Sequence, residues 1–339
     1  MRETRVSFKT QEYRRQGNFR RTSPTISARG RMPIDERGRQ YDYMLALGHE
    51  DENLYPTLRG PEGVRRFFDE RNVTWWRHDE FDAPGVNGPT RNMASSQVSC
   101  LNFVLPLAGI EKGLQALLAA IDDDVTDVVT IEDPTTAAAS RVEFEWIGLG
   151  HALEGESETR RGEFSTSVDA FLVAQTRTGR RAYLLEWKYT EFYGNNDMGR
   201  GRKGWTRRSR YGKPYAVSPS FREQVPLDAW LHEPFYQIMR QRLLADRIVA
   251  RRELGVCEAK VVLVVPNGNL EYSRSLTSPT LLAAFPDAQS VEDVTRAAMN
   301  VPDRDFAVVS QHTIGEVVRA RCGGAVRHWS EYHRERYGW

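Results

Sequence analysis

The sequence predicts an α/β fold in which a mixed central sheet carries helices on both faces. The main observation is the order of its patterns: a helical segment, three strand-like segments, a second helix, a strand, and a region that ends in a strand and a helix. The second observation is composition. Of the 339 residues, 40% are apolar and 27% are charged, as in a globular protein with a sizeable core.

The N-terminal part of the chain is expected to be an extension outside the main domain. Residues 1–40 are polar, rich in arginine and interrupted by glycine and proline, so they are expected to form a flexible basic arm, or an arm that follows a phosphate backbone. Residues 41–93 give mixed signals and are assigned to an accessory region. The main domain is then expected at 94–322, with a C-terminal tail at 323–339.

Four segments have helical patterns. In 95–109, apolar residues recur near helical spacing and Ser95 or Ser96 is available as N-cap; "EKGLQALLAAI" continues as a second helical piece. Pro234 suits the first turn of a later helix, and Gly255 is expected just beyond its end. The segment "TIGEVVRARCG" predicts a closing helix.

Five segments have strand patterns. The apolar alternation in "SRVEFEW" predicts a half-buried strand. The next two, "TSVDAFLVAQT" and "GRRAYLLEWKY", flank the turn "TRTGR" and predict a hairpin. Two further strands are expected in "AKVVLVVPNG" and "DFAVVSQ".

Several classes of protein are disfavoured. Cysteines 100, 257 and 322 are odd in number and far apart, which gives neither a disulfide framework nor a zinc spacing and suits the reducing cytoplasm. No apolar run approaches 18 residues, so neither secretion nor a membrane span is expected. The net charge of +1 means that only local basic clusters can indicate nucleic-acid binding.

The end of the predicted hairpin gathers charged residues. Closing the hairpin brings Asp169 near Glu186, and Lys188 shares the face of Glu186 because alternate strand residues point the same way. Two carboxylates in a partly buried place repel each other, and Mg²⁺ relieves that repulsion. A neighbouring lysine can bind the attacking water and offset charge on a phosphate. The pattern therefore favours a metal-dependent phosphodiester hydrolase, although a surface ion pair beside a turn aspartate is the alternative.

The stretch "TSVDAFLVAQTRTGRRAYLLEWKYTEFYG" resembles the PD-(D/E)xK nuclease superfamily, and most of all bacterial restriction-endonuclease-like proteins in which Thr-Ser-x-Asp-Ala precedes Glu-Trp-Lys-Tyr-Thr-Glu. The resemblance runs from about residue 90 to 315. It implies a restriction-endonuclease-like fold. It also implies that Asp169 and Glu186 are catalytic metal ligands, that the Trp187 carbonyl is a further ligand, and that Lys188 is the catalytic lysine. The Pro-Asp of the superfamily name is Val168-Asp169 here.

The resemblance further implies a cofactor and an upstream acidic ligand. Mg²⁺ is expected, with Mn²⁺ as a substitute. An upstream glutamate commonly completes such a site; Glu145 is the preferred candidate, with Glu143 and Glu111 as rivals.

The polar insert 194–222 contains "GRGRKGWTRRSRYGKPY", in which basic and aromatic residues alternate. Such a mixture suits phosphate contact and base stacking, although a solvated charged loop is the alternative. On the following helix Gln237 and Arg240 belong to a polar patch that either reaches nucleic acid or faces solvent. The candidate contacts in the insert are Arg200, Arg202, Lys203, Trp205, Arg207, Arg208 and Arg210.

The expected function is hydrolysis of phosphodiester bonds in DNA by a restriction-type or DNA-defence endonuclease in the cytoplasm. Cutting both strands would favour a homodimer. The main alternative is a nucleic-acid-binding protein that keeps the nuclease fold without cutting; a third reading is an interaction protein whose charged hairpin faces solvent. RNA as the substrate stays open.

Overall fold

The structure is a computed structural model that describes residues 6–32, 41–77, 82, 86–132, 139–155, 161–162 and 165–339. Its centre is a sheet with the strand order β1-β3-β4-β5-β6, and β2 also pairs with β3. The strands are β1 (Val125–Val129), β2 (Glu143–Trp146), β3 (Val168–Thr176), β4 (Gly179–Trp187), β5 (Val256–Val264) and β6 (Phe306–Val309).

The sheet is mixed, as predicted. Strands β3 and β4 form the expected antiparallel hairpin, while β4–β5 and β5–β6 are parallel pairs. Both β1 and β2 run antiparallel to β3. Strand β1 lies in a segment in which no strand was predicted. Strand β2 is buried along its whole length, so the expected half-buried strand is wrong. Its charged Glu143 is buried because two arginines pair with it.

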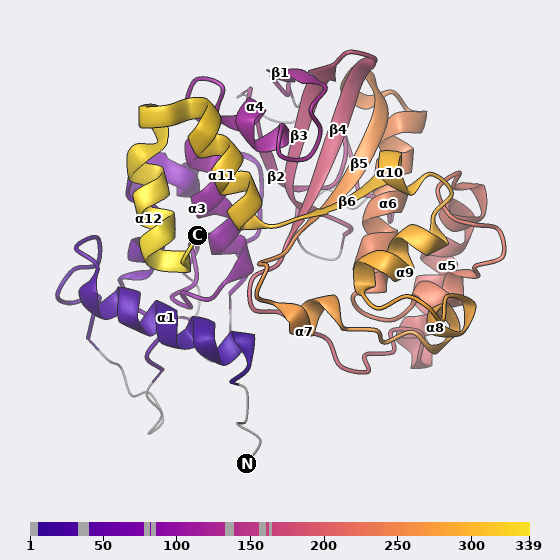
Figure 1. Ribbon diagram of the computed structural model, residues 1–339, viewed down its shortest axis with the longest axis horizontal. Coiled ribbons are helices and arrows are strands. Elements are labelled where there is room, and N and C mark those ends of the chain that lie inside the picture. Colours follow the sequence, from indigo (N-terminus) through magenta and orange to yellow (C-terminus); the bar gives the residue numbers. More distant parts are fainter. Residues whose placement is uncertain are drawn as a thin grey trace.

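Helices cover both faces of the sheet (Figure 1), and two hydrophobic clusters fill the space between. One face packs against α1 (Phe8–Thr22), α2 (Arg66–Glu70), α3 (Ser96–Ala108), α4 (Gly113–Leu118), α11 (Gln311–Cys322) and α12 (Arg327–Tyr337). The other face packs against α5 (Gly201–Val217), α6 (Phe235–Ala250), α8 (Pro279–Ala284) and α9 (Val291–Ala298). Two short helices, α7 (Leu270–Ser273) and α10 (Pro302–Asp305), complete the order. This arrangement is consistent with a restriction-endonuclease-like fold.

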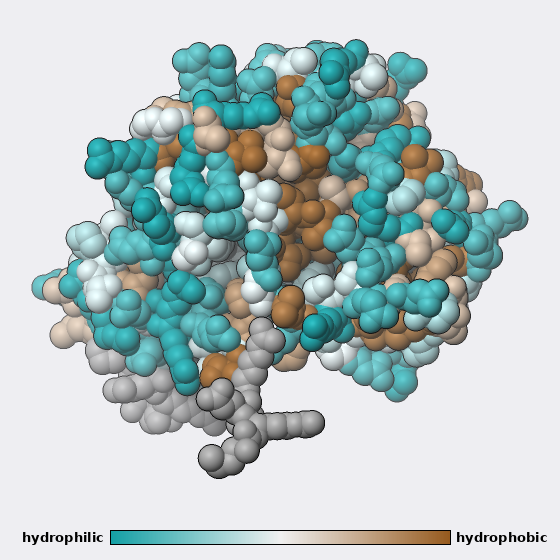
Figure 2. All heavy atoms as spheres, viewed as in Figure 1, coloured by the Kyte–Doolittle hydropathy of each residue, from teal (hydrophilic) through white to brown (hydrophobic). Residues whose placement is uncertain are grey.

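The surface in the view of Figure 2 is largely hydrophilic, with apolar atoms gathered in a hollow between the two helical groups. None of the described helices is long and apolar enough to cross a membrane.

Some helix boundaries follow local capping rules. The hydroxyl of Ser95 accepts a hydrogen bond from the backbone N–H of Val98 at 3.3 Å, so Ser95 is the N-cap of α3. Helix α6 begins after Pro234, as predicted, but it ends at Ala250. Gly255 instead closes a short turn with φ 74°, five residues beyond the helix, so its predicted role at the helix end is wrong.

The N-terminal segment differs from the expected flexible arm. Residues 8–22 form α1, whose Phe19 is only 1% exposed in the core. Glu12 and Gln16 are buried too, and each makes a hydrogen bond with the hydroxyl of Tyr189. The sequence pattern could not show this because polar side chains with distant partners do most of the packing. Residues 1–5 and 33–40 of the predicted arm lie outside the described residues.

The predicted C-terminal tail is also part of the packed structure. Residues 327–337 form α12, which contacts α1 and α3. The indole N–H of Trp329 donates to the carbonyl of Phe103 at 3.0 Å, and the guanidinium of Arg336 is fully buried among partners from α1 and the 50–53 turn. The chain ends therefore brace one helical layer.

The polar insert is a helix and not the charged loop that its composition suggested. Helix α5 spans 17 residues and turns Gly204 and Tyr211 inward. Its remaining side chains are half-buried or exposed. The composition did not predict this helix, because α5 packs against the rest of the protein through few apolar residues.

Candidate active site

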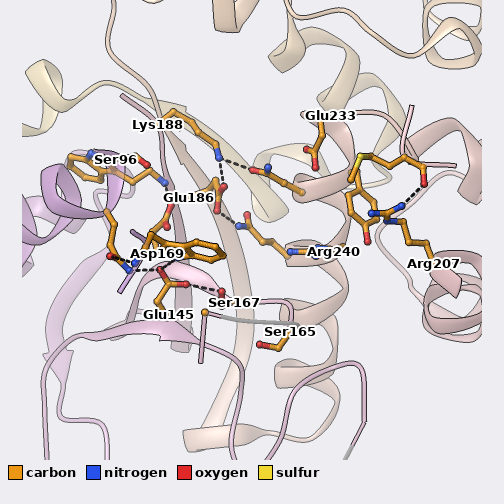
Figure 3. A pocket seen from close by; sticks show the side chains of 18 of the residues that line it. Ser96, Glu145, Ser165, Ser167, Asp169, Glu186, Lys188, Arg207, Glu233 and Arg240 are labelled. Carbon is orange, nitrogen blue, oxygen red and sulfur yellow. Dashed lines mark hydrogen bonds and ion pairs between the residues drawn. The ribbon is translucent and has the colours of Figure 1, made fainter. Parts of the chain in front are cut away.

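A cavity of about 650 Å³ opens at the end of the sheet where the hairpin motif finishes. The start of α3 forms one wall, the ends of β2, β3 and β4 form the floor, and α5 and α6 form the opposite wall. Figure 3 shows Glu145, Asp169 and Glu186 gathered on the sheet side, with Arg207 and Arg240 across from them. The volume of the cavity is typical of a small-molecule or substrate site.

Asp169 sits where β3 separates from β4. The ladder between these strands ends at the pair Ala170–Leu185, and the Asp169 carboxylate takes the next position by accepting the N–H of Trp187 at 2.6 Å. The N–H and C=O of one strand residue point to the same side. The carbonyl of Trp187 is therefore directed toward Asp169, as a third ligand would need to be.

Glu186 and Lys188 point from β4 toward α6, and both side chains are buried. The Lys188 ammonium lies 2.5 Å from a Glu186 oxygen and donates to Oε1 of Gln237 at 2.6 Å. The second oxygen of Glu186 accepts from the amide of Gln241. The Lys188 backbone is held by Gln311 of α11, which donates to its carbonyl at 2.8 Å. The pair is thus fixed from both helical layers.

Glu145 lines the same cavity, and its carboxylate accepts three hydrogen bonds. These come from the indole of Trp76 at 2.8 Å, the amide of Gln97 at 3.0 Å and the hydroxyl of Ser167 at 2.8 Å. Its backbone has φ 47°, a region that costs energy for a residue with a side chain. Such strain in a residue that faces a cavity indicates a functional position.

The two rivals of Glu145 lie elsewhere. Glu143 is buried between Arg71, at 3.0 Å, and Arg161, at 2.6 Å, which is a structural role in the core. Glu111 is exposed in the turn between α3 and α4. Of these three glutamates, Glu145 alone lines the cavity, although its role as a ligand stays a prediction.

The carboxylates affect one another electrostatically. Burial raises the pKa of Glu145 to about 7, against the lowering effect of its three hydrogen bonds. Burial, and then repulsion from Glu186 and Glu145, raises the pKa of Asp169 well above its usual value. Burial alone would lower the pKa of Lys188, but the combined effect of Glu186 and of neighbouring acidic groups on Tyr193, Tyr272 and Glu191 outweighs burial and raises that pKa. The site therefore crowds carboxyl groups that favour a proton, or a bound cation, beside one lysine that stays protonated.

These residues suit a divalent cation in their chemistry, because they offer hard carboxylate and carbonyl oxygens at a place where burial, and to a lesser extent repulsion, already raises the pKa values of Glu145 and Asp169. Both oxygens of Glu186 already accept hydrogen bonds, one from Lys188 and one from Gln241. One of these bonds must break before Glu186 can bind a metal ion. Within the described ranges, no three His, Cys, Asp or Glu side chains converge closely enough to hold a metal by themselves. The expected set of Asp169, Glu186 and the Trp187 carbonyl contains only two carboxylates and needs no such trio, but Glu145 as a further ligand would have to move closer to them.

The basic residues of the insert divide between two faces of α5. Lys203, Arg207 and Arg210 are three or four residues apart and line the cavity. The other four candidates are not among the lining residues. Arg200 pairs with Asp197, and Arg208 pairs with Asp228. Arg202 is exposed, and Trp205 is 70% exposed.

Gln237 and Arg240 of α6 both line the cavity, so the polar patch predicted on this helix faces the site and not solvent. Gln237 links Lys188 to the hydroxyl of Tyr193. The Arg240 guanidinium lies 5.0 Å from the ring of Tyr236, and its Nε is buried without a hydrogen-bond partner among the described residues. An unpaired buried donor facing a cavity is suited to an anionic ligand.

A scan against protein-family models matches residues 42–338 to the family described as "Restriction Endonuclease associating with ARP". The chain belongs to this family. A search of curated proteins and a search of solved structures found no match. Membership in a restriction endonuclease family indicates a nuclease, and it agrees with the resemblance carried by the hairpin motif.

Several residues that line this cavity or hold Glu145 in place were missed by sequence reasoning. Trp76, Gln97 and Ser167 hold Glu145, while Glu233 lines the wall beside Lys188. Burial raises the pKa of Glu233, and one of its oxygens has no hydrogen-bond partner among the described residues. No local pattern marks these residues, because they come from loops and helix ends that only the folded chain brings together.

Proposed function

We propose that this member of the restriction endonuclease family is a metal-dependent endodeoxyribonuclease of the restriction or DNA-defence type. One observation carries the proposal: Asp169, Glu186, Lys188 and Glu145 line a single cavity opposite a basic helical wall. Acidic groups on one side and cations on the other fit a metal ion and a phosphodiester held between them.

The acidic side would hold the ion. Asp169, Glu186 and the Trp187 carbonyl are the ligands we assign to Mg²⁺ or Mn²⁺, and Glu145 is the added acidic ligand. When bound, the ion supplies charge stabilisation at the phosphate and lowers the pKa of a bound water. The protein fixes this set by the hydrogen bond from Trp187 to Asp169 and by the three donors around Glu145.

Lys188 acts as a charged donor in this proposal. Because its pKa is raised in the folded protein, it remains protonated at neutral pH and is suited to orient the attacking water or to stabilise charge on the phosphate. It is less suited to remove a proton from the water. Gln237 would keep its ammonium group in place through their 2.6 Å hydrogen bond.

The basic wall would bind the DNA backbone. Lys203, Arg207 and Arg210 lie on one face of α5, and Arg240 extends the wall on α6. Such cations neutralise phosphates in any sequence and position the strand over the acidic side. We keep a homodimer and a cytoplasmic location as proposals that rest on the predicted double-strand cleavage and on the cysteine pattern.

The experiment that tests the function is cleavage of supercoiled plasmid with Mg²⁺, with Mn²⁺ and with chelator. We expect cutting with either ion, none with chelator, and none by Asp169→Ala. Asp228→Ala, which removes an exposed carboxylate paired with Arg208, is the matched control and should cut normally. DNA binding without cutting under every condition would favour the alternative, a non-catalytic protein that keeps the nuclease fold.

A further inference from the structure

Trp76 presents an aromatic ring at the candidate active site. Its backbone N–H donates to the side chain of Gln97 at 2.9 Å, and its indole N–H donates to Glu145 at 2.8 Å. The residue nevertheless remains 51% exposed and lines the cavity. The hydrogen bonds of the backbone N–H and the indole N–H fix the orientation of Trp76, while about half of its side chain stays exposed. Such a ring is suited to stack on a flat ligand.

Other exposed rings lie on segments that border the site. In the described parts of the chain, Phe192 is 53% exposed and Trp205 is 70% exposed. Phe192 follows Lys188 by four residues, and Trp205 lies between Lys203 and Arg207 in the sequence of α5, although neither ring is among the residues that line the cavity. Basic groups that follow a backbone, combined with exposed aromatic rings, are the features by which proteins bind single-stranded nucleic acid.

The cavity constrains what reaches Trp76. Inside a duplex both faces of a base are covered by its neighbours, so a stacked base cannot use the ring of Trp76. A volume of about 650 Å³ is large enough for one nucleotide that has left the stack. The ring and the carboxylate of Glu145 are joined by one hydrogen bond, so such a base would lie beside the acidic group.

We propose that the nucleotide at the cleavage position is unpaired and that its base stacks on Trp76. This inference rests on the proposed nuclease function and specifies its substrate as single-stranded DNA, or duplex DNA with a locally unpaired nucleotide. Trp76 then has two separable parts. Its ring selects the substrate, and its N–H positions Glu145.

The test compares three fluorescent DNA oligonucleotides of one sequence: single-stranded, perfectly paired, and paired with one unpaired nucleotide. Binding is measured by anisotropy with Ca²⁺ in place of Mg²⁺, and cleavage is then mapped with Mg²⁺. We expect the wild type to bind the single strand and the bulged duplex about tenfold more tightly than the perfect duplex, because one stacked base contributes an effect of this order. Cuts should fall at the unpaired nucleotide.

Two variants separate the parts of Trp76. Trp76→Leu removes both the ring and the N–H donor, and it should abolish the preference for unpaired DNA as well as lower cleavage. Trp76→Phe keeps a ring and loses the N–H donor, so it should keep the preference while cleavage falls. Val301→Ala, which trims an exposed apolar side chain on the segment before α10, is the control and should match the wild type.

The outcomes distinguish this inference from the function beneath it. If the wild type binds and cuts the perfect duplex as well as the bulged one, the nuclease function stands and the unpaired-base proposal is overturned. An equal preference in Trp76→Leu would also overturn it. If no DNA is bound or cut, both proposals fail. Should Trp76→Leu not fold, the comparison of the three DNAs by the wild type still decides.

Discussion

The backbone N–H of Trp187 donates a 2.6 Å hydrogen bond to Oδ2 of Asp169, across the point where their two strands separate. The bond replaces the ladder pair that would have followed Ala170–Leu185. It fixes the carboxylate of one strand against the backbone of the strand that carries Glu186 and Lys188. The charged end of the hairpin is therefore a rigid part of the sheet.

This bond allows the metal role of Asp169 to be separated from its structural role. Asn at position 169 keeps an oxygen that can accept the Trp187 N–H but removes the negative charge. We expect Asp169→Asn to lose measurable Mn²⁺ binding by calorimetry while its melting temperature stays close to that of the wild type. Asp169→Ala should lose Mn²⁺ binding and should also have a lower melting temperature. Retained Mn²⁺ affinity in the Asn variant would exclude Asp169 from the ligand set.

Lys188 should be needed for cleavage and not for binding. Lys188→Met keeps the side-chain length and removes the ammonium beside Glu186, so cleavage with Mg²⁺ should fall by about 10²-fold or more, while DNA affinity changes little. The measurement is single-turnover cleavage together with anisotropy binding.

A matched control for that change exists on the neighbouring strand. Lys260 of β5 is also buried and pairs with Asp122 at 2.6 Å, outside the cavity. Lys260→Met should lose stability and still cut at the wild-type rate per folded molecule. Equal rates for Lys188→Met and the wild type would remove Lys188 from the mechanism.

The two faces of α5 should differ in their effect on DNA binding. Replacing Lys203 and Arg210 with Gln removes two cations that line the cavity, and replacing Arg202 and Arg208 removes two that do not. We expect the first pair to weaken binding and to reduce the salt slope by about one for each lost phosphate contact. The second pair should change the slope less. Equal slopes for both double variants would mean that α5 attracts DNA without orienting it.

The raised pKa of Glu145 should make the metal-free protein less stable as pH rises. Below pH 4.5 this carboxyl is protonated in both the folded and the unfolded chain. Between 4.5 and about 7 the folded chain keeps a proton that the unfolded chain has lost, so the free energy of unfolding falls with rising pH, by up to about 3 kcal/mol.

Urea unfolding in chelator from pH 4.5 to 8 measures this effect. Glu145→Gln cannot ionise, so its stability curve should be flatter over that range. Mn²⁺ should stabilise the wild type more at pH 8 than at pH 5, because only the ionised carboxylate binds the ion. A wild-type curve as flat as that of the variant would show that Glu145 titrates normally.

Helix α1 should behave as part of the core although it precedes the range matched by the family. Phe19→Ala removes a buried ring and should cost about 3 to 5 kcal/mol in unfolding free energy. Phe192→Ala removes an exposed ring and is the control. Its unfolding free energy should change by about a few tenths of a kcal/mol at most. A loss for Phe19→Ala as small as that of the control would restore the idea of a flexible arm.

The sequence by itself determined the hairpin and the charged residues that meet at its end. Strand periodicity placed Glu186 and Lys188 on one face, and the hairpin length brought Asp169 to them. The mixed sheet, the capping of α3 by Ser95 and the start of α6 followed from equally local signals. Such features depend on neighbours within a few residues, or on one turn, so the sequence is sufficient to predict them.

Only the tertiary structure decided what surrounds that hairpin. It distinguished Glu145 from Glu143, since one faces the cavity and the other is neutralised by two arginines in the core. It turned the basic insert into a two-sided helix and made α1 a brace behind Tyr189. These outcomes depend on side chains that are up to hundreds of residues apart in the sequence. Such side chains come into contact only when the helical layers pack on the sheet.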